Sequence, residues 1–359
     1  MLRAGTFGLY FHFFYLSNYM IKTLDHSSIK QWDEYVENSS LATFFHKAGW
    51  KEVIENAFGH QTYFLYTEQK GKVTGILPLV HINSLLFGNS LSSCAFCVYG
   101  GIVADNKESF AKLDKKACEL AEELGVDYLE MRNRTQITPE RPYKALYVTF
   151  RKELDKDEEK NMLAIPRKQR ATIRKGIKAG LSSEIDEGIE RFYQAYSESV
   201  RNLGTPVFAK KYFEILKQVF KEQCEILIVV DAQGQLIASV MNFYFKDEVL
   251  PYYGGGTEHA RAVQGNDFMY WEVMRRAVEK GIKVFDYGRS KEGTGSYRFK
   301  KHWGFEPKPL YYEFQLIKSD AIPDINPLNP KYQIFIAAWK RLPLVISQTI
   351  GPWLAKDLG

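Results

Sequence analysis

A chain of 359 residues with 45% hydrophobic content is long enough for one large core or two cores of ordinary size, and two domains are the starting expectation. The formal net charge is only +5, which excludes a globally basic surface, so any anionic partner must be met by a local patch. Four cysteines are too few for a disulfide framework, which indicates a reducing compartment.

The N-terminal segment, residues 1–19, holds an aromatic run preceded by one arginine. The run is shorter than the roughly 20 apolar residues of a membrane span, and no small-residue cleavage site follows it. We therefore expect residues 1–19 to be an unstructured extension, or the product of a start codon set too far upstream, rather than a signal peptide or an anchor. The remaining sequence predicts no membrane-spanning helix, so a cytoplasmic location is expected.

Cys94 and Cys97 form a single C-x-x-C pair. A zinc site needs a second pair at similar spacing, and Cys118 and Cys224 each stand alone. We therefore expect a buried strand at this position and no metal.

An internal repeat organises much of the chain. Each copy contains a turn glycine with an apolar strand, a glycine-containing segment, a helix with apolar positions three and four residues apart, and a short final strand. Gly125 and Gly281 follow the two helices and suit the left-handed conformation found beyond a helix end. Five features in the same order favour duplication of one α/β unit. The corresponding segments are 70–80 with 233–243 and 98–103 with 252–257.

Charged residues stand near the C-terminal end of the last strand in both copies. Glu130 and Arg132 mark this end in the first copy, and Asp286 and Arg289 mark it in the second. Hairpin strands followed by a helical crossover are typical of a mixed sheet with helices on its faces. Because strands in such sheets gather ligands at their C-terminal ends, we expect Arg132, Asp286 and Arg289 to lie where chemistry takes place.

The join between the copies carries a basic helix. Pro166 can begin this helix, and helical spacing then aligns Arg167, Arg170 and Arg174 on one face. A stripe of one charge sign repels itself, and arginines suit bidentate phosphate contacts, so we favour phosphate binding over a merely solvated face. The sequence has no RNA-recognition motif, KH loop or P-loop, and sequence-specific reading of nucleic acid is not supported.

Two segments of the second half add candidate contacts. Residues 198–216 join two helix-like stretches through a turn, where Arg201, Asn202 and Thr205 could contact a substrate. An equally good interpretation is that these residues only form the turn.

The C-terminal tail is strongly apolar, with tryptophans beside cations. We favour docking of the tail on the body of the protein and keep a membrane interface as the alternative.

Taken together, several strings resemble the FemAB family of aminoacyl-transferases, which are built from two acetyltransferase-like (GNAT) domains. These strings are the basic join RKQRATIRKGIKAGL, then VFDYGRS and GSYRFKKHWGF, and the match is nearest to FemAB-like proteins associated with the exosortase and PEP-CTERM systems of exopolysaccharide-producing bacteria. The resemblance implies a mixed α/β fold of two tandem GNAT-like domains. The expected parts are a first domain at 20–155, the connecting helix at 156–183, a catalytic second domain at 184–318 and an amphipathic tail at 319–359.

The resemblance further implies transfer of an activated acyl or aminoacyl group to an amine. The donor would be aminoacyl-tRNA or acyl-CoA as a co-substrate, with no tightly bound cofactor, and the acceptor a nucleotide- or lipid-linked saccharide of the cell envelope or of an exopolysaccharide. The string RAVQGNDF matches the usual GNAT pyrophosphate loop poorly, which weakens coenzyme A as donor. The alternatives are a CoA- or acyl-carrier-dependent N-acyltransferase of an amino sugar and a non-catalytic scaffold that binds phosphate or RNA.

The stretch 287–307 has four glycines and reads as a loop that holds a substrate. Its Phe-Lys pair matches the family's Phe-Lys element, which implies that Lys300 stabilises an oxyanion or a carboxylate. Asp286 would act as a base or, as we favour, orient Arg289, and Tyr297 would relay a proton or pack. The expected substrate contacts are Arg289, Lys301, Trp303, Arg167, Arg170, Arg174, Arg201, Asn202, Thr205 and Tyr253.

Overall fold

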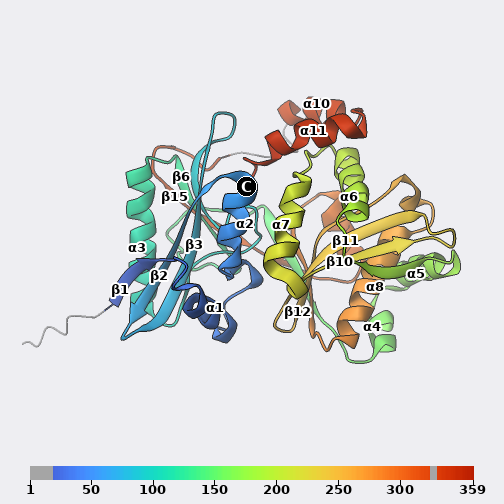
Figure 1. The fold of residues 1–359 in the computed structure, drawn as a ribbon, viewed down its shortest axis with the longest axis horizontal. Helices are drawn as coiled ribbons and strands as arrows, with labels where there is room; N and C mark the ends of the chain where they lie inside the picture. The colour runs from blue at the N-terminus through green and yellow to red at the C-terminus, as the bar shows by residue number, and fades with distance from the viewer. Residues whose placement is uncertain (1–18, 324–329) are drawn as a thin grey trace, which may run out of the picture.

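The structure is a computed structural model that describes residues 19–323 and 330–359. The expected N-terminal extension therefore lies outside the described residues except for Tyr19, which begins the first strand. Two mixed sheets lie side by side, each covered by helices (Figure 1). This arrangement is the mixed α/β, tandem fold that the sequence repeat predicts.

The first sheet has the strand order β1-β2-β3-β4-β6-β15-β7, with β5 paired to β3. Helices α1, α2 and α3 pack around it. The bounds are β1 (Tyr19–Thr23), α1 (Ile29–Asn38), α2 (Gly49–Phe58), β2 (Gln61–Gln69), β3 (Lys72–Ser84), β4 (Gly88–Ser93), β5 (Val103–Ala104), α3 (Lys107–Leu124), β6 (Tyr128–Asn133), β7 (Tyr143–Lys144) and β15 (Tyr311–Leu316).

The second sheet has the strand order β14-β8-β13-β12-β11-β10-β9. Its strands are β8 (Tyr147–Glu153), β9 (Ser182–Asp186), β10 (Cys224–Val230), β11 (Leu236–Phe245), β12 (Glu248–Gly256), β13 (Val284–Lys291) and β14 (Pro307–Pro309). Its helices are α4 (Glu158–Ala164), α5 (Arg167–Lys178), α6 (Glu190–Leu203), α7 (Lys210–Phe220), α8 (Gly265–Glu279) and α9 (Gly295–His302), and the tail forms α10 (Pro330–Trp339) and α11 (Leu344–Ala355).

The duplicated unit is visible in the strand pairing. In the first half β3 and β4 are antiparallel and α3 leads to β6, which runs parallel to β4. In the second half β11 and β12 are antiparallel and α8 leads to β13, which runs parallel to β12. Gly125 and Gly281, which follow the two helices, have φ of 59° and 76°, the left-handed conformation expected for glycines there.

One pair of the predicted repeat segments differs in structure. Residues 252–257 lie largely in β12, whereas β4 ends at Ser93 and residues 98–103 follow a turn. The expected buried strand at Cys94 and Cys97 is wrong in the same way: both side chains are buried, but they lie in this turn, with Cys94 at a φ of 45°. An apolar run predicts burial and does not distinguish a packed turn from a strand.

The two halves exchange strands. Strand β8 follows the first half in the chain but pairs with β13 of the second sheet, and β15 follows the second half but pairs with β6 of the first. The expected ranges 20–155 and 184–318 therefore each contain a strand of the other sheet. Because β6 and β13 carry the strand-end arginines, the exchange places both at the junction.

An aromatic core also crosses the junction. The ring of Phe44, from the first half, lies 4.6 Å from that of Phe220 in α7 and 4.6 Å from that of Phe243 in β11. Trp50 at the start of α2 lies 5.2 Å from Phe220. All four side chains are buried, so the halves share one packed core and hold the junction in a fixed geometry.

Candidate active site at the junction of the two sheets

The strand β13 carries a bulge where the site begins. Its register against β8 shifts between Asp286 and Arg289. Gly288 has a φ of 64°, a conformation that a residue with a Cβ adopts only at a cost, and its N–H donates to Asp286 Oδ1 at 2.7 Å. A bulge re-aims the side chains on either side of it, which is how β13 presents both an acid and an arginine at the junction.

Lys300 ties this bulge to the helix that follows. Its Nζ donates to the backbone carbonyls of Tyr287 at 2.7 Å, Gly288 at 3.2 Å and Arg289 at 3.0 Å. Lys300 lies in α9, whose first turn is capped by the Thr294 hydroxyl. The stretch 287–307 is therefore the end of a strand and a short capped helix rather than the expected loop.

The three carbonyls use all the donors of Lys300. A lysine ammonium has three N–H groups, so none is left for a substrate oxygen in this geometry. Burial lowers the pKa of Lys300 to about 7, against the opposing effect of Asp286, and Arg289 lowers it further. Because a neutral amine has only two N–H groups, the full set of bonds requires the charged form. This arrangement favours a role in holding the bulge over direct contact with an oxyanion.

Asp286 pairs with a different arginine from the one expected. Its carboxylate is almost fully buried and lies 3.1 Å from Arg151 Nε, and it accepts from Tyr99 Oη at 3.1 Å and from Thr149 Oγ1 at 3.4 Å. No contact with Arg289 accompanies these among the described residues. The strand exchange is the reason, because β8 places Arg151 directly opposite Asp286 in the register of the second sheet.

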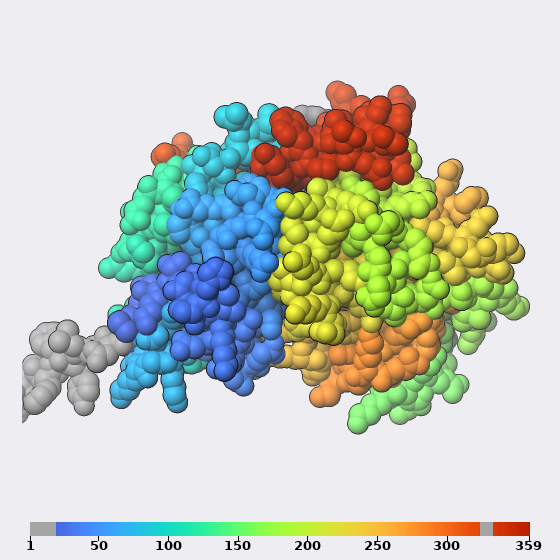
Figure 2. Space-filling model, viewed as in Figure 1, coloured from blue at the N-terminus to red at the C-terminus, as the bar shows by residue number. Residues whose placement is uncertain are grey.

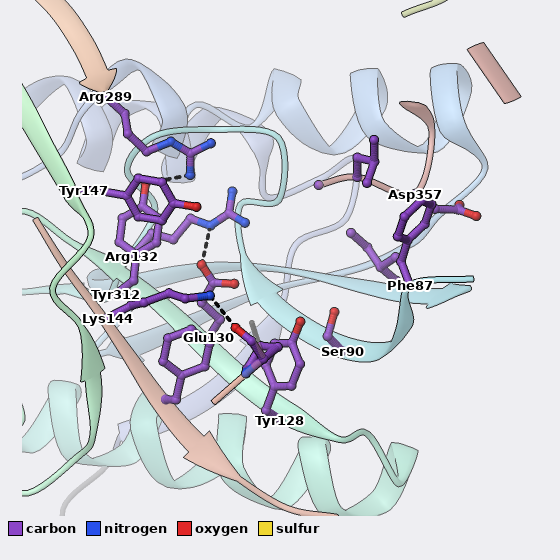
Figure 3. A pocket seen from close by; sticks show the side chains of 15 residues that line it. Phe87, Ser90, Tyr128, Glu130, Arg132, Lys144, Tyr147, Arg289, Tyr312 and Asp357 are labelled. Carbon is purple, nitrogen blue, oxygen red and sulfur yellow. Dashed lines mark hydrogen bonds and ion pairs between the residues drawn. The ribbon is translucent and has the colours of Figure 1, made fainter. Parts of the chain in front are cut away.

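A cavity of about 150 Å³ lies where β6, β13, β15 and β8 meet, and the two strand-end arginines converge on it (Figure 3). Arg132 is buried; its Nε donates to Glu130 Oε1 at 3.0 Å and its Nη1 to the carbonyl of Cys97 at 2.8 Å. The guanidinium carbon of Arg132 lies 5.5 Å from the ring centre of Tyr312. Arg132 is thus held in place by protein groups.

Arg289 differs because it remains accessible from the cavity. Its guanidinium carbon lies 4.6 Å from the ring centre of Tyr147 and 5.6 Å from that of Tyr312, and its Nη1 donates to Tyr312 Oη at 3.3 Å. Within residues 19–323 and 330–359 no carboxylate pairs with it. An accessible guanidinium without an acidic partner, walled by aromatic rings, is suited to a carboxylate or phosphate group. The other cavity walls are Ile82, Phe87, Ser90, Tyr128, Lys144, Phe314, Pro323, Asp357, Leu358 and Gly359.

A second cavity of about 470 Å³ lies beyond Arg132, which lines both. Tyr99 and Thr149 of the Asp286 network line this second cavity together with Arg134. Burial and the charge of Asp286 raise the pKa of Tyr99, so its hydroxyl stays protonated and can donate. The sequence interpretation did not include Tyr99, Tyr147 or Tyr312, since their positions depend on long-range pairing.

Two of the expected substrate contacts lie in the core instead. Trp303 has no exposed surface, and its Nε1 donates to Asp267 Oδ1 at 3.0 Å. Tyr253 is buried and shares a hydrogen bond of 2.8 Å with the Tyr212 hydroxyl. Both aromatic side chains thus contact protein groups within the core. Tyr297 is half-buried with its ring edge-on to Phe150, and Lys301 is exposed.

The remaining candidates lie in two other places. Arg167 and Arg174 are exposed on α5, at the outer edge of the second half and away from the junction, and half-buried Arg170 donates to the carbonyl of Leu163 at 3.3 Å (Figure 1). At the end of α6, Arg201 Nη1 donates to the carbonyl of Leu342 at 2.9 Å in the tail. Next to Arg201, the side chains of Asn202 and Thr205 are exposed. The structure therefore brings Arg289 together with Arg132, and not with these two groups.

Comparisons with known proteins agree with this architecture. Residues 167–301 match the model of the Acetyltransferase (GNAT) domain. FemX superposes with a TM-score of 0.64 at 14% identity, over 88% of this chain and 100% of FemX. A tandem GNAT protein from the clavulanic acid biosynthesis pathway gives 0.53 at 13% identity, over 85% and 100% of the two chains.

L-PGS from Bacillus licheniformis superposes with a TM-score of 0.54 at 12% identity, over 90% of this chain and 99% of that one. A search of curated proteins finds no match. The chain thus has the tandem GNAT fold, and its residues 167–301 are similar to the GNAT acetyltransferase domain, which supports an acyltransferase. In the described part of the chain no helix is both long and apolar enough to cross a membrane.

Proposed function

We propose that the protein is a FemAB-like acyl or aminoacyl transferase that forms an amide on an amine of a cell-envelope or exopolysaccharide precursor. The observation that carries the proposal is the junction cavity, where Arg289 is accessible, has no acidic partner in the described part of the chain, and lies beside the fixed Arg132. Precursors of this class carry phosphate or carboxylate groups, which guanidinium groups bind with two parallel hydrogen bonds. The link to exosortase and PEP-CTERM systems is supported by the sequence resemblance alone.

The residues around the cavity suggest a division of roles. Attack of the amine on the acyl carbonyl forms a C–N bond and a tetrahedral oxyanion, whose collapse breaks the bond from the carbonyl carbon to the donor's oxygen or sulfur. The proton that the amine nitrogen loses ends on that leaving oxygen or sulfur. The protonated Tyr99 hydroxyl, held by Asp286, is our candidate donor to that oxyanion or to the leaving group. Lys300 holds the bulge that presents Arg289, and Asp286 orients Tyr99 and Arg151 rather than Arg289. Tyr297 packs beside them on α9.

The donor is proposed to be aminoacyl-tRNA. Arg167, Arg170 and Arg174 lie on α5, far from the cavity, so a donor that reaches both surfaces must be long, as a tRNA is (Figure 1). The second candidate donor is an acyl-CoA, which the match to a GNAT acetyltransferase domain favours. In either case the donor is a co-substrate and not a tightly bound cofactor.

A transfer assay with both donor classes tests the proposal. Purified protein is incubated with a pool of charged tRNA or of acyl-CoA and with nucleotide-linked or lipid-linked amino sugars, and the acceptors are read by mass spectrometry. We expect a mass increment on one acceptor that Arg289→Ala reduces strongly. If no donor produces an increment while phosphorylated acceptors still bind in a manner that depends on Arg289, the non-catalytic scaffold is the correct interpretation.

A further inference from the structure

The C-terminal helix α11 is packed with its apolar face outward. Its buried residues are the small ones, Ser347, Gly351 and Ala355, and the ideal Cβ position of Gly351 lies only 3.0 Å from the backbone nitrogen of Val207. Its large apolar side chains are exposed to 73% at Val345, 44% at Ile346, 42% at Ile350 and 62% at Trp353.

The helical positions explain this division. With 3.6 residues per turn, one side of the helix carries the large apolar residues Val345, Ile346, Ile350 and Trp353. The opposite side carries the small buried residues. The helix contains no charged residue. A helix on a protein surface in water normally shows the reverse pattern, with polar residues outward, so this face is suited to an apolar environment.

Two other elements extend the same face. In α10 the side chains of Ile334 and Phe335 are 80% and 41% exposed. The turn between β3 and β4 exposes Leu85 fully and Leu86 to 62%. This hairpin rises on the same side of the molecule as α10 and α11, and Figure 2 shows the tail against the first half there. The tail is fastened next to the turn of the hairpin, where Asp357 Oδ2 accepts from the hydroxyl of Ser84, the last residue of β3, at 2.8 Å.

Basic residues predominate in this region. Between Asp324 and Asp357 the sequence has four basic residues and no acidic residue. Lys340 and Arg341, which join α10 to α11, are exposed. Apolar side chains with an exposed tryptophan and flanking cations are the features of a surface that lies at the interface of an anionic bilayer. A second protein copy would need acidic residues opposite these cations, and none of the described residues of α10, α11 and the turn 85–87 is acidic, so this face offers none to a twofold partner.

We propose that the apolar face formed by α10, α11 and Leu85–Leu86 docks on the surface of an anionic lipid bilayer. Phe87 and Leu358 line the junction cavity and are neighbours in sequence of residues on or beside this face, so docking would bring the cavity close to the membrane surface. For a transferase of the proposed function, which this consequence assumes, the acceptor would then be lipid-linked. The docking itself does not depend on catalysis.

Tryptophan fluorescence offers a direct test on the full chain. The protein has six tryptophans, of which five are at most 3% exposed, and Trp353 is 62% exposed. Vesicles of phosphatidylcholine with phosphatidylglycerol should shift the emission to the blue and protect it from acrylamide, and vesicles of phosphatidylcholine alone should do so much less. Trp353→Phe should remove the spectral change, with binding followed independently by vesicle flotation.

Flotation of variants identifies the docking face. Lys340→Glu with Arg341→Glu should weaken partitioning of the protein into anionic vesicles by about 25-fold or more, since each cation near an anionic surface contributes about fivefold to the partition coefficient. Val345→Ser with Ile350→Ser should weaken it by about tenfold or more. Leu163→Ser, at a side chain of matched exposure (57%) on α4, should leave partitioning into vesicles unchanged.

The proposal is overturned if the protein does not float with anionic vesicles, or if the tail variants float as the unchanged protein does. It is also overturned if sedimentation shows a dimer that dissociates in the tail variants, while neither the unchanged protein nor any variant binds vesicles. The face would then be an interface between copies of the chain. Failure of the transfer reaction with intact vesicle binding would instead count against the proposed function alone.

Discussion

Replacing Arg289 by alanine tests whether the junction cavity binds an anion. In the protein without ligand, Arg289 makes one long hydrogen bond of 3.3 Å to Tyr312 and stacks on Tyr147. A cation over an aromatic ring at an accessible site contributes about 0.5–1 kcal/mol, so Arg289→Ala should lower the free energy of unfolding by about 1 kcal/mol. The fold should therefore survive the change.

The effect on ligand binding should be much larger. A hydrogen bond to a charged group contributes about 1.5–3 kcal/mol, so loss of a bidentate contact removes about 3 kcal/mol or more. Since about 1.4 kcal/mol is a factor of ten, the dissociation constant should rise about 100-fold. Isothermal titration with UDP-N-acetylglucosamine and with inorganic pyrophosphate, together with the KM for an acceptor once one is known, measures this change. Arg289→Lys should recover only part of the affinity, because an ammonium cannot bind in a fork.

Arg132→Ala is the matched comparison. This arginine is buried, bonds the carbonyl of Cys97, and balances the charge of Glu130, so its loss leaves a buried carboxylate unpaired. Such a change is expected to reduce the free energy of unfolding by about 3–5 kcal/mol. Urea denaturation should thus separate the two variants. If Arg289→Ala binds every anionic probe with unchanged affinity, the cavity is not an anion site and the reasoning fails.

Three further predictions concern Lys300 and the basic stripe of α5. Lys300→Met should reduce transfer by removing the tie to three carbonyls, with a fall in kcat and a rise in KM; full activity would discard any role for Lys300 in the reaction. Because folding lowers the pKa of Lys300 from 10.5 to about 7, the unfolded chain binds the extra proton between these values, and the free energy of unfolding should rise with pH there by up to about 1.4 kcal/mol per unit. Lys300→Met should flatten that dependence in urea titrations, and an equal slope in both proteins would contradict the shifted pKa. Arg170→Ala with Arg174→Ala should weaken donor binding and reduce its dependence on salt, whereas unchanged affinity would leave only a solvated helix face.

The sequence by itself determined the duplicated unit and its strand-end charges. Periodicity depends on local geometry, because an apolar residue every three or four positions buries one face of a helix wherever that helix packs. The helices that end before Gly125 and Gly281, and the final strands beyond them, follow from such local patterns. The convergence of Arg132 and Arg289 followed from the rule that strand ends gather ligands, since both stand at equivalent positions of the repeat.

Only the tertiary structure decided which groups these residues meet. The apolar pattern of a strand predicts which of its faces is buried, but it does not predict which strand it pairs with. The exchange of β8 and β15 between the two sheets could therefore not be predicted from local sequence. That exchange pairs Asp286 with Arg151, and within the described residues Arg289 is left without an acidic partner. The partners of Lys300 also depend on tertiary structure, because its three carbonyl partners come from the bulge in β13. The outward apolar face of α11 does so too, because burial on one side of a helix depends on what packs against it.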